Sequence, residues 1–234
     1  MRHLSVVGLF IVLQQSASFS LLQLSRAQSF RREVLAASRE EEGVTVTLKI
    51  ALDQQGGVDD LTAKSFRFTS EDSLDLVHRL RACSDAIGVG IGTVRRDNPS
   101  LLVRRGVRCE KQPLRVIFDS TFTSARDAIV FSDHFPTLVF TLPRGSSCEA
   151  APGESSCEMA PNKSVRELRA SDREGLLEAL EYLSREKQVK SLMVEGGVKL
   201  ARSFLKLKLI DRAIVITAPV FFDQPVPSGG VPLI

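Results

Sequence analysis

The sequence has 234 residues, of which 43% are hydrophobic and 25% charged, as is ordinary for a globular enzyme. Its formal net charge of +3 is accounted for by arginines near the N-terminus, so the rest carries no basic face that would favour nucleic acid. Three histidines outside ligand spacing and four cysteines without a CxxC pair predict no metal site.

The first 42 residues differ from the rest. The apolar run 4–13 has the length of a signal-peptide core and is too short to span a bilayer. Small residues follow, and the acid-free, arginine- and serine-containing stretch 19–32 is typical of a transit peptide. This order resembles the bipartite presequence of algae with secondary plastids; a secretory signal or a mitochondrial presequence are the alternatives. We expect residues 1–42 to be disordered and absent from the mature protein, which then has no membrane segment.

The domain from residue 43 onward begins with a strand, because apolar and polar residues alternate over 44–52. Ser70 is expected to cap a helix that ends near Cys83 and buries the stripe Leu74, Val77 and Leu80. Apolar runs predict further strands at 86–91, 113–119 and 137–141.

The second half of the domain continues the alternation. Residues 144–163 are expected to form an exposed loop insertion. Ser171 is expected to cap a helix to about Glu186, whose inward face would be Leu176, Leu177, Leu180 and Leu183. Strands at 189–195 and 211–220 flank a helix over 198–206. The pattern predicts an α/β domain with a largely parallel sheet.

The segment from Glu195 to Val198 is the first that points to chemistry. A strand ends in a carboxylate, Gly196 and Gly197 allow close approach of the backbone, and a helix begins. The free N–H groups of such a helix start favour an anion such as a pyrophosphate. A plain glycine connection between strand and helix is the alternative, and the segment lacks the GxGxxG dinucleotide pattern.

The second such segment is 88–104. Thr93 and Asp97 are four residues apart and face one pocket if a helical turn lies between them, which Asn98-Pro99 would then stop. The glycines at 88, 90 and 92 lack the Lys-Ser/Thr of a phosphate-binding P-loop. A polar loop between two strands is the alternative.

Short blocks between residues 44 and 220 occur in a fixed order: Leu48-Lys49-Ile50-Ala51, Thr69-Ser70, Leu80-Arg81-Ala82, Asp85-Ala86-Ile87, Gly92-Thr93-Val94 with Asp97-Asn98-Pro99-Ser100-Leu101 and Arg104, 115–120, Val194-Glu195-Gly196-Gly197 and 216–219. Together they resemble the reductase domain of riboflavin biosynthesis, the 5-amino-6-(5-phosphoribosylamino)uracil reductase family. The resemblance implies a three-layer, dihydrofolate-reductase-like fold with a mostly parallel central sheet, NADPH as cofactor, a pyrimidine ribose phosphate as substrate, and a homodimer.

The same resemblance implies roles for individual residues. NADPH would contact Ala51, Thr93, Asp97, Ser120, Gly196, Gly197, Val198, Lys199 and Leu200. The substrate would contact Ser65, Arg81, Leu101, Arg104 and Glu195, and the two arginines suit a phosphate because a guanidinium can pair with its oxygens bidentately. The resemblance, together with Ser120 and the nearby basic residues Arg95 and Arg96, favours NADPH over NADH.

The implied reaction passes hydride to C1′ of the ring-opened ribosyl group, which gives the ribityl form. Glu195, Lys49 and Asp97 are the catalytic candidates, and one of them or a water would supply the proton. Asp53-Gln54-Gln55-Gly56 departs from the family's Ser-Leu-Asp-Gly, and the chain stops at Ile234, short of its relatives. A catalytically inactive paralogue that acts as a binding module, or a pterin reductase of the same fold, are therefore the alternatives.

Overall fold

The structure, a computed structural model, describes residues 9–14, 43–60, 68–123, 127–143, 162–170 and 172–228. The strands are β1 (Leu9–Gln14), β2 (Thr45–Leu52), β3 (Gly57–Asp60), β4 (Ala86–Gly90), β5 (Leu114–Phe118), β6 (Thr137–Thr141), β7 (Lys163–Glu167), β8 (Ser191–Glu195), β9 (Arg212–Thr217) and β10 (Pro225–Pro227). The helices are α2 (Glu71–Ala82), α3 (Ile91–Asp97), α4 (Ile129–Ser132), α5 (Arg173–Lys187) and α6 (Val198–Lys206).

The central sheet has the strand order β1-β9-β2-β8-β4-β5-β6-β7, and neighbouring strands run parallel. β2 is buried at every second residue, as its alternating sequence predicts, and it pairs with β8, which lies far along the chain. In that pair Lys49 is directly opposite Glu195. The register therefore brings together two charged residues that are distant in sequence.

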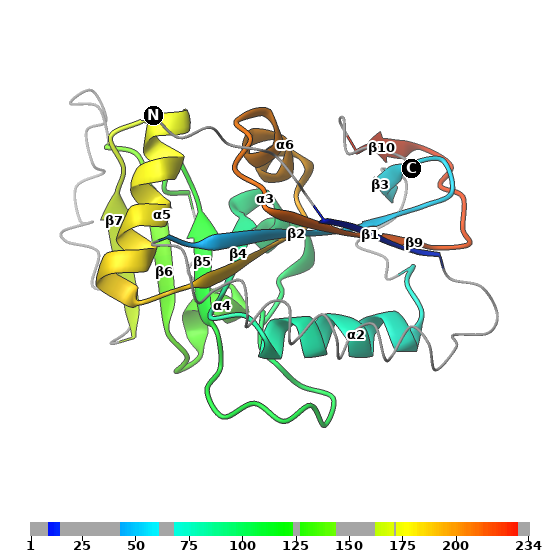
Figure 1. The fold of residues 1–234 in the computed structure, drawn as a ribbon, viewed down its shortest axis with the longest axis horizontal. Helices are drawn as coiled ribbons and strands as arrows, with labels where there is room; N and C mark the ends of the chain where they lie inside the picture. The colour runs from blue at the N-terminus through cyan, green and yellow to red at the C-terminus, as the bar shows by residue number, and fades with distance from the viewer. Residues whose placement is uncertain are drawn as a thin grey trace.

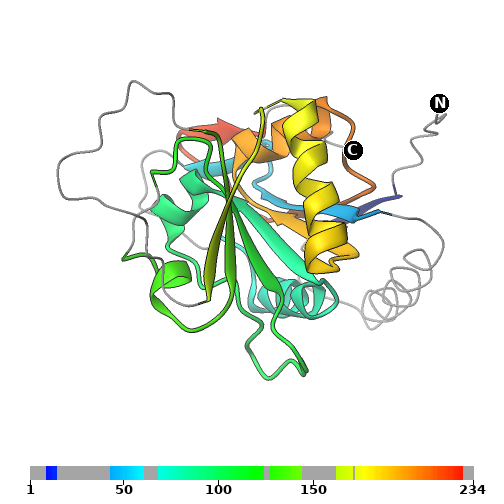
Figure 2. The same ribbon diagram turned by 90° about the vertical axis from the view of Figure 1, so that its left-hand side faces the viewer.

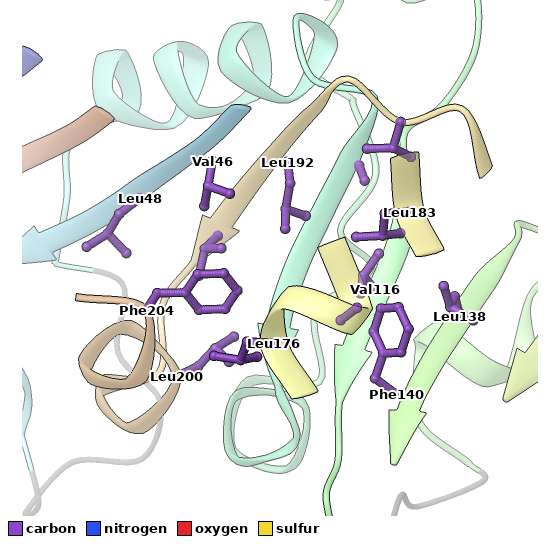
Figure 3. Close-up of a cluster of buried hydrophobic side chains, with 14 of the residues drawn as sticks. Val46, Leu48, Val116, Leu138, Phe140, Leu176, Leu183, Leu192, Leu200 and Phe204 are labelled. Atoms are coloured by element: carbon purple, nitrogen blue, oxygen red, sulfur yellow. The ribbon is translucent and has the colours of Figure 1, made fainter. Parts of the chain in front are cut away.

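Helices cover both faces of the sheet, so the predicted three-layer α/β fold is confirmed (Figures 1 and 2). α5 and α6 lie on one face, where Leu183 and Phe204 join Leu48, Val116 and Leu192 from the strands (Figure 3). α2 and α4 lie on the opposite face and pack against a second cluster of strand residues. Burial of these two apolar surfaces is the main force that holds the layers together.

A two-stranded antiparallel sheet of β3 and β10 lies beside the main sheet. Asp53, fully buried at the end of β2, accepts hydrogen bonds from the N–H groups of Gln55, Gly57 and Phe222, at 2.9, 2.6 and 2.9 Å. Its carboxylate thus holds both the hairpin and the C-terminal segment. Residues 53–56 depart from the family pattern, but the hydrogen bonds of Asp53 still hold this loop in place.

Helix α5 differs in detail from the sequence expectation. Its N-cap is Asp172, whose side chain accepts from the N–H groups of Glu174 and Gly175, and Ser171 lies outside the described residues. Leu177, expected inside, is 41% exposed, whereas Ala179 is buried in its place. The inward face was predicted from the leucines because they are the most hydrophobic residues of the helix. In the structure Ala179 faces the sheet instead of Leu177.

Short elements were also missed. β7 carries the sequence Lys-Ser-Val-Arg-Glu, and α4 is a single turn, so neither has a hydrophobic period long enough to recognise. β7 includes Lys163, the last residue of the expected loop insertion; residues 144–161 lie outside the described part. β9 ends at Thr217, three residues before the predicted boundary.

β1 corrects the expectation that residues 1–42 are disordered. Leu9–Gln14 form a strand that pairs in parallel with Arg212–Thr217 of β9. An apolar run of high strand propensity can satisfy the N–H and C=O groups that an edge strand such as β9 otherwise presents to solvent. Among the described residues no helix is long and apolar enough to cross a membrane.

Candidate active site

A cleft of about 1410 Å³ lies at the carboxyl ends of the parallel strands β2, β8, β4, β5 and β6. Ligands of open α/β sheets bind at this edge, because the strands end there in loops and helix N-termini. The cleft is larger than a typical drug-sized pocket of roughly 300–1,000 Å³. It therefore has room for a dinucleotide and a second molecule together.

Every predicted site residue that the structure describes lines this cleft: Lys49, Ala51, Arg81, Thr93, Asp97, Leu101, Arg104, Ser120, Glu195, Gly196, Gly197, Val198, Lys199 and Leu200. Ser65 lies outside the described residues. Residues that the sequence separates by as many as 151 positions thus share one cavity. Within the described part of the chain, no group of three His, Cys, Asp or Glu side chains could hold a metal ion.

Arg81 and Glu195 form a bidentate ion pair in the wall of the cleft. Arg81 Nε donates to Glu195 Oε1 at 2.7 Å and Nη2 donates to Oε2 at 2.8 Å. Nη1 donates to the carbonyl of Leu102 at 3.1 Å. Both side chains are only 11% exposed. Most of the guanidinium is therefore engaged within the protein, and Arg81 fixes the orientation of the Glu195 carboxylate.

The Arg81–Glu195 ion pair affects the pKa values of Glu195 and Lys49. Burial alone would raise the pKa of the Glu195 carboxyl, but the charge and hydrogen bonds of Arg81 outweigh burial and hold that pKa below its usual value. Burial lowers the pKa of the Lys49 ammonium, with Glu195 opposing and Arg81 reinforcing this effect. Glu195 is thus an anion at neutral pH, and Lys49 is a stronger acid than a surface lysine.

The turn between β8 and α6 is built from glycines in the left-handed region, Gly196 at φ 56° and Gly197 at φ 68°. A methyl group at Gly197 would come within 2.8 Å of the Thr93 hydroxyl oxygen. Gly197 is also the N-cap of α6, where no side chain accepts from the first-turn N–H groups. The predicted anion site therefore lies in the wall of the cleft, and its backbone closely approaches Thr93 of α3.

The loop after α3 is held by a buried arginine. Arg115 has no exposed surface; it pairs bidentately with Asp133 at 2.5 and 2.8 Å and donates to the carbonyl of Ser100 at 3.3 Å. Leu101, the next residue, adopts φ 56°, a conformation that costs a non-glycine residue about 1–3 kcal/mol. The network stabilises this conformation and fixes the path of the loop to Arg104.

Two basic residues of α3 have different surroundings. Arg96 pairs with Asp59 of β3 and donates to the carbonyl of Asp60 at 2.9 Å, so it joins α3 to β3. Arg95 is exposed and donates to the carbonyl of Thr123, in the loop that follows Ser120. Arg96 lines the cleft, whereas Arg95 does not line it and lies beside the loop that follows Ser120.

The sequence reasoning missed both an apolar end and a histidine of the cleft. The apolar end consists of Leu142, Leu168, Ala170 and Leu176, and it was missed because β7 was not recognised. His78 lies three residues before Arg81, so helical spacing places both on one face of α2 and could have identified it. The charged end, with Lys49 on β2, and the apolar end beyond β6 are four strand spacings apart, roughly 19 Å.

The comparisons with known proteins agree on one family. Residues 43–231 match the RibD C-terminal domain. The chain is 34% identical over 196 residues to the 2,5-diamino-6-ribosylamino-4(3H)-pyrimidinone 5′-phosphate reductase of Archaeoglobus fulgidus, which covers 79% of this chain and 86% of that protein. It is 32% identical over 190 residues to the riboflavin biosynthesis protein RibD of Aquifex aeolicus, covering 81% of this chain and 50% of that protein.

Solved structures show the same fold. RibD of Acinetobacter baumannii superposes with a TM-score of 0.69 at 24% identity, over 87% of this chain and 54% of that one. The riboflavin biosynthesis reductase Rib7 of Saccharomyces cerevisiae superposes with a TM-score of 0.63 at 19% identity, over 87% and 88%. The chain spans about half the length of the RibD proteins and most of the length of the archaeal and yeast reductases. By sequence and by its dihydrofolate-reductase-like fold, this chain belongs to the RibD C-terminal domain family.

Proposed function

We propose that the protein is an NADPH-dependent oxidoreductase that reduces the ribosyl side chain of 5-amino-6-(5-phosphoribosylamino)uracil, or of its diamino counterpart, to the ribityl form in riboflavin biosynthesis. One observation carries the proposal: a single cleft joins a glycine-built anion site at α6 to a charged end around Glu195, Lys49 and Arg104. Membership of the family and the names of the archaeal relatives support it.

The residues of the cleft fit the cofactor. The uncapped N-terminus of α6, with Gly197 in close approach to Thr93, suits the pyrophosphate, and the apolar side chains around Leu168 suit the adenine. Ala51 and Gly196 lie where the nicotinamide would reach the charged end. When bound, NADPH supplies the hydride for the reduction.

The charged end supplies the proton and holds the sugar. Hydride addition to C1′ of the open-chain imine leaves its nitrogen to take one proton, which completes the amine. Lys49 Nζ is a better proton donor than Glu195. The pKa of Lys49 is lowered, mainly by burial, whereas Glu195 stays ionised and has no proton to give. Glu195, oriented by Arg81, would accept hydrogen bonds from the ribose hydroxyls, and Arg104 would pair with the phosphate.

The proposal is tested with the purified protein and both pyrimidine phosphates, the deaminated and the diamino form, by following NADPH absorbance and identifying the ribityl product. A dephosphorylated substrate serves as the matched control and should react with a much higher KM. If neither phosphate nor a pterin is reduced, the result supports the inactive binding module. Reduction of a pterin in preference to both would support the pterin reductase.

NADPH is expected to be preferred over NADH, and Arg95→Ala should narrow the preference by about tenfold, since one charged hydrogen bond to the 2′-phosphate would be lost. The ratio of kcat/KM for the two cofactors measures it. Arg96→Ala is the matched control, because Arg96 is engaged by Asp59. Equal kcat/KM values for the two cofactors in the wild type would contradict the assignment.

Targeting and assembly are proposed from sequence and resemblance. Residues 1–42, fused to a fluorescent reporter in an alga with a secondary plastid, should send it to the plastid. Deletion of residues 1–16 should leave the reporter outside the secretory route, because the transit-like half alone does not enter it. A reporter that is secreted, or that reaches mitochondria with or without those residues, would refute a bipartite presequence. The proposed homodimer is measured by light scattering.

A further inference from the structure

His78 is a buried histidine in the wall of the cleft to which the proposed reaction assigns no role. It lies on α2, is 7% exposed, and its Nδ1 accepts a hydrogen bond from the backbone N–H of Arg104 at 3.0 Å. The bond joins α2 to a loop 26 residues further along the chain. An imidazole that accepts at Nδ1 is neutral and carries its proton on Nε2.

The surroundings of His78 favour this neutral form. Burial lowers its pKa, and the charges of Arg81, Arg104 and Arg105 lower it further, while Glu195 opposes them. Asp75, on the same helix, also interacts with the imidazole but is engaged by Arg105. The pKa of His78 therefore lies below its ordinary value of about 6.5.

The backbone around Arg104 is fixed at three successive residues. The side chain of Gln112 bonds both the N–H and the C=O of Val103, at 2.7 and 3.0 Å. His78 holds the N–H of Arg104, and the side chain of Arg105 pairs with Glu71 and Asp75 of α2. The Arg104 guanidinium is exposed in the cleft, and within the described ranges no hydrogen bond or ion pair holds it. Its main chain is thus positioned while its side chain is left for a ligand.

We propose that His78 is a positioning residue, whose neutral imidazole holds the Arg104 backbone so that the guanidinium faces the phosphate of the substrate. The inference rests on the proposed function, in which Arg104 binds that phosphate. Positioning before binding strengthens an interaction because less freedom is lost when the ligand arrives.

The role has a consequence for pH. Protonation turns Nδ1 into a donor, which faces the N–H of Arg104 and repels it, so the anchor is lost as the pH falls through the pKa of His78. Phosphate binding should weaken on acidification even though the imidazolium adds a positive charge. The substrate phosphate also titrates near pH 6, so only a difference between protein variants isolates the contribution of His78.

Two substitutions separate the two nitrogens. In His78→Asn the amide oxygen takes the place of Nδ1, keeps an acceptor and does not titrate. In His78→Gln the amide lies near the position of Nε2 and leaves the Arg104 N–H without its partner. His78→Gln is expected to raise KM for the pyrimidine phosphate about tenfold with kcat within about twofold. His78→Asn should restore KM at pH 7.5 and lack the additional rise of KM that the wild type shows as the pH falls through the lowered pKa of His78.

His134→Asn is the matched control, because His134 is exposed and does not line the cleft. Melting temperatures of the variants exclude unfolding. The proposal is overturned if His78→Asn raises KM as much as His78→Gln does. It is also overturned if KM of the wild type and of His78→Asn rises equally on acidification, or if KM of the wild type falls. Calorimetry with inorganic phosphate repeats the pH comparison without turnover. The protein could bind phosphate in a His78-dependent way and yet reduce neither pyrimidine. That result would contradict the proposed function but not the positioning role of His78.

Discussion

Replacing Arg81 with alanine is expected to lower kcat/KM by roughly two to three orders of magnitude, because removing one partner of a buried, hydrogen-bonded charge pair in a binding site costs about 2–5 kcal/mol of binding free energy. The loss should fall on kcat as well as on KM, since Arg81 orients Glu195 through two hydrogen bonds. This differs from a pure phosphate clamp, which would change KM alone.

The pH dependence of the Arg81→Ala variant has a definite sign. Arg81 holds the pKa of Glu195 down against burial, so without Arg81 the pKa rises. Activity that needs the Glu195 carboxylate is then lost at a higher pH as the solution is acidified. The measurement is the pH profile of kcat/KM for wild type and variant; an unshifted acid limb would contradict the role of the pair.

Controls for Arg81 come from its own helix and from its partner. Arg79→Ala removes an exposed arginine of α2 and should leave both kinetic constants unchanged. Arg81→Lys keeps the charge but not the planar fork, and it should be intermediate. Arg81→Ala combined with Glu195→Gln should lose less than the sum of the two single losses, because residues that act as a unit are not additive.

Gly197→Ala is expected to weaken NADPH binding roughly ten- to a hundredfold. A non-glycine residue at φ 68° costs about 1–3 kcal/mol, and its methyl group would press on the Thr93 hydroxyl at 2.8 Å. If the backbone moves to relieve the strain or the contact with Thr93, the first turn of α6 is displaced from the anion that it is proposed to bind. Calorimetric titration with NADPH measures the effect.

Gly106→Ala is the matched control for Gly197. Gly106 has nearly the same φ, 69°, but a methyl group there meets no atom within 4 Å, and Gly106 does not line the cleft. The Gly106→Ala variant should lose about as much folding stability as Gly197→Ala, but it should bind NADPH as tightly as the wild type. Equal affinities in the Gly197→Ala variant and the wild type would show that the turn does not hold the cofactor.

Short-range sequence patterns determine the helices and strands around the cleft. The alternation in β2, the Ser70 cap of α2, the stop of α3 at Asn98-Pro99 and the bounds of α6 follow from contacts within a few residues, so they are readable without the fold. The family blocks added the identity of the site residues, and every one that the structure describes lines the cleft.

The tertiary structure decided what depends on distant residues. The pairing of Arg81 with Glu195 joins positions 114 residues apart, and the bond from Arg104 to His78 links a loop to the middle of a helix. No local pattern contains such a partner, because side-chain charge alone does not say which opposite charge will be adjacent after folding. The same holds for β1, which pairs because β9 has an open edge. The sequence by itself predicted residues that line the cleft, whereas only the fold determined that Arg81 pairs with Glu195 and that the Arg104 side chain is exposed in the cleft.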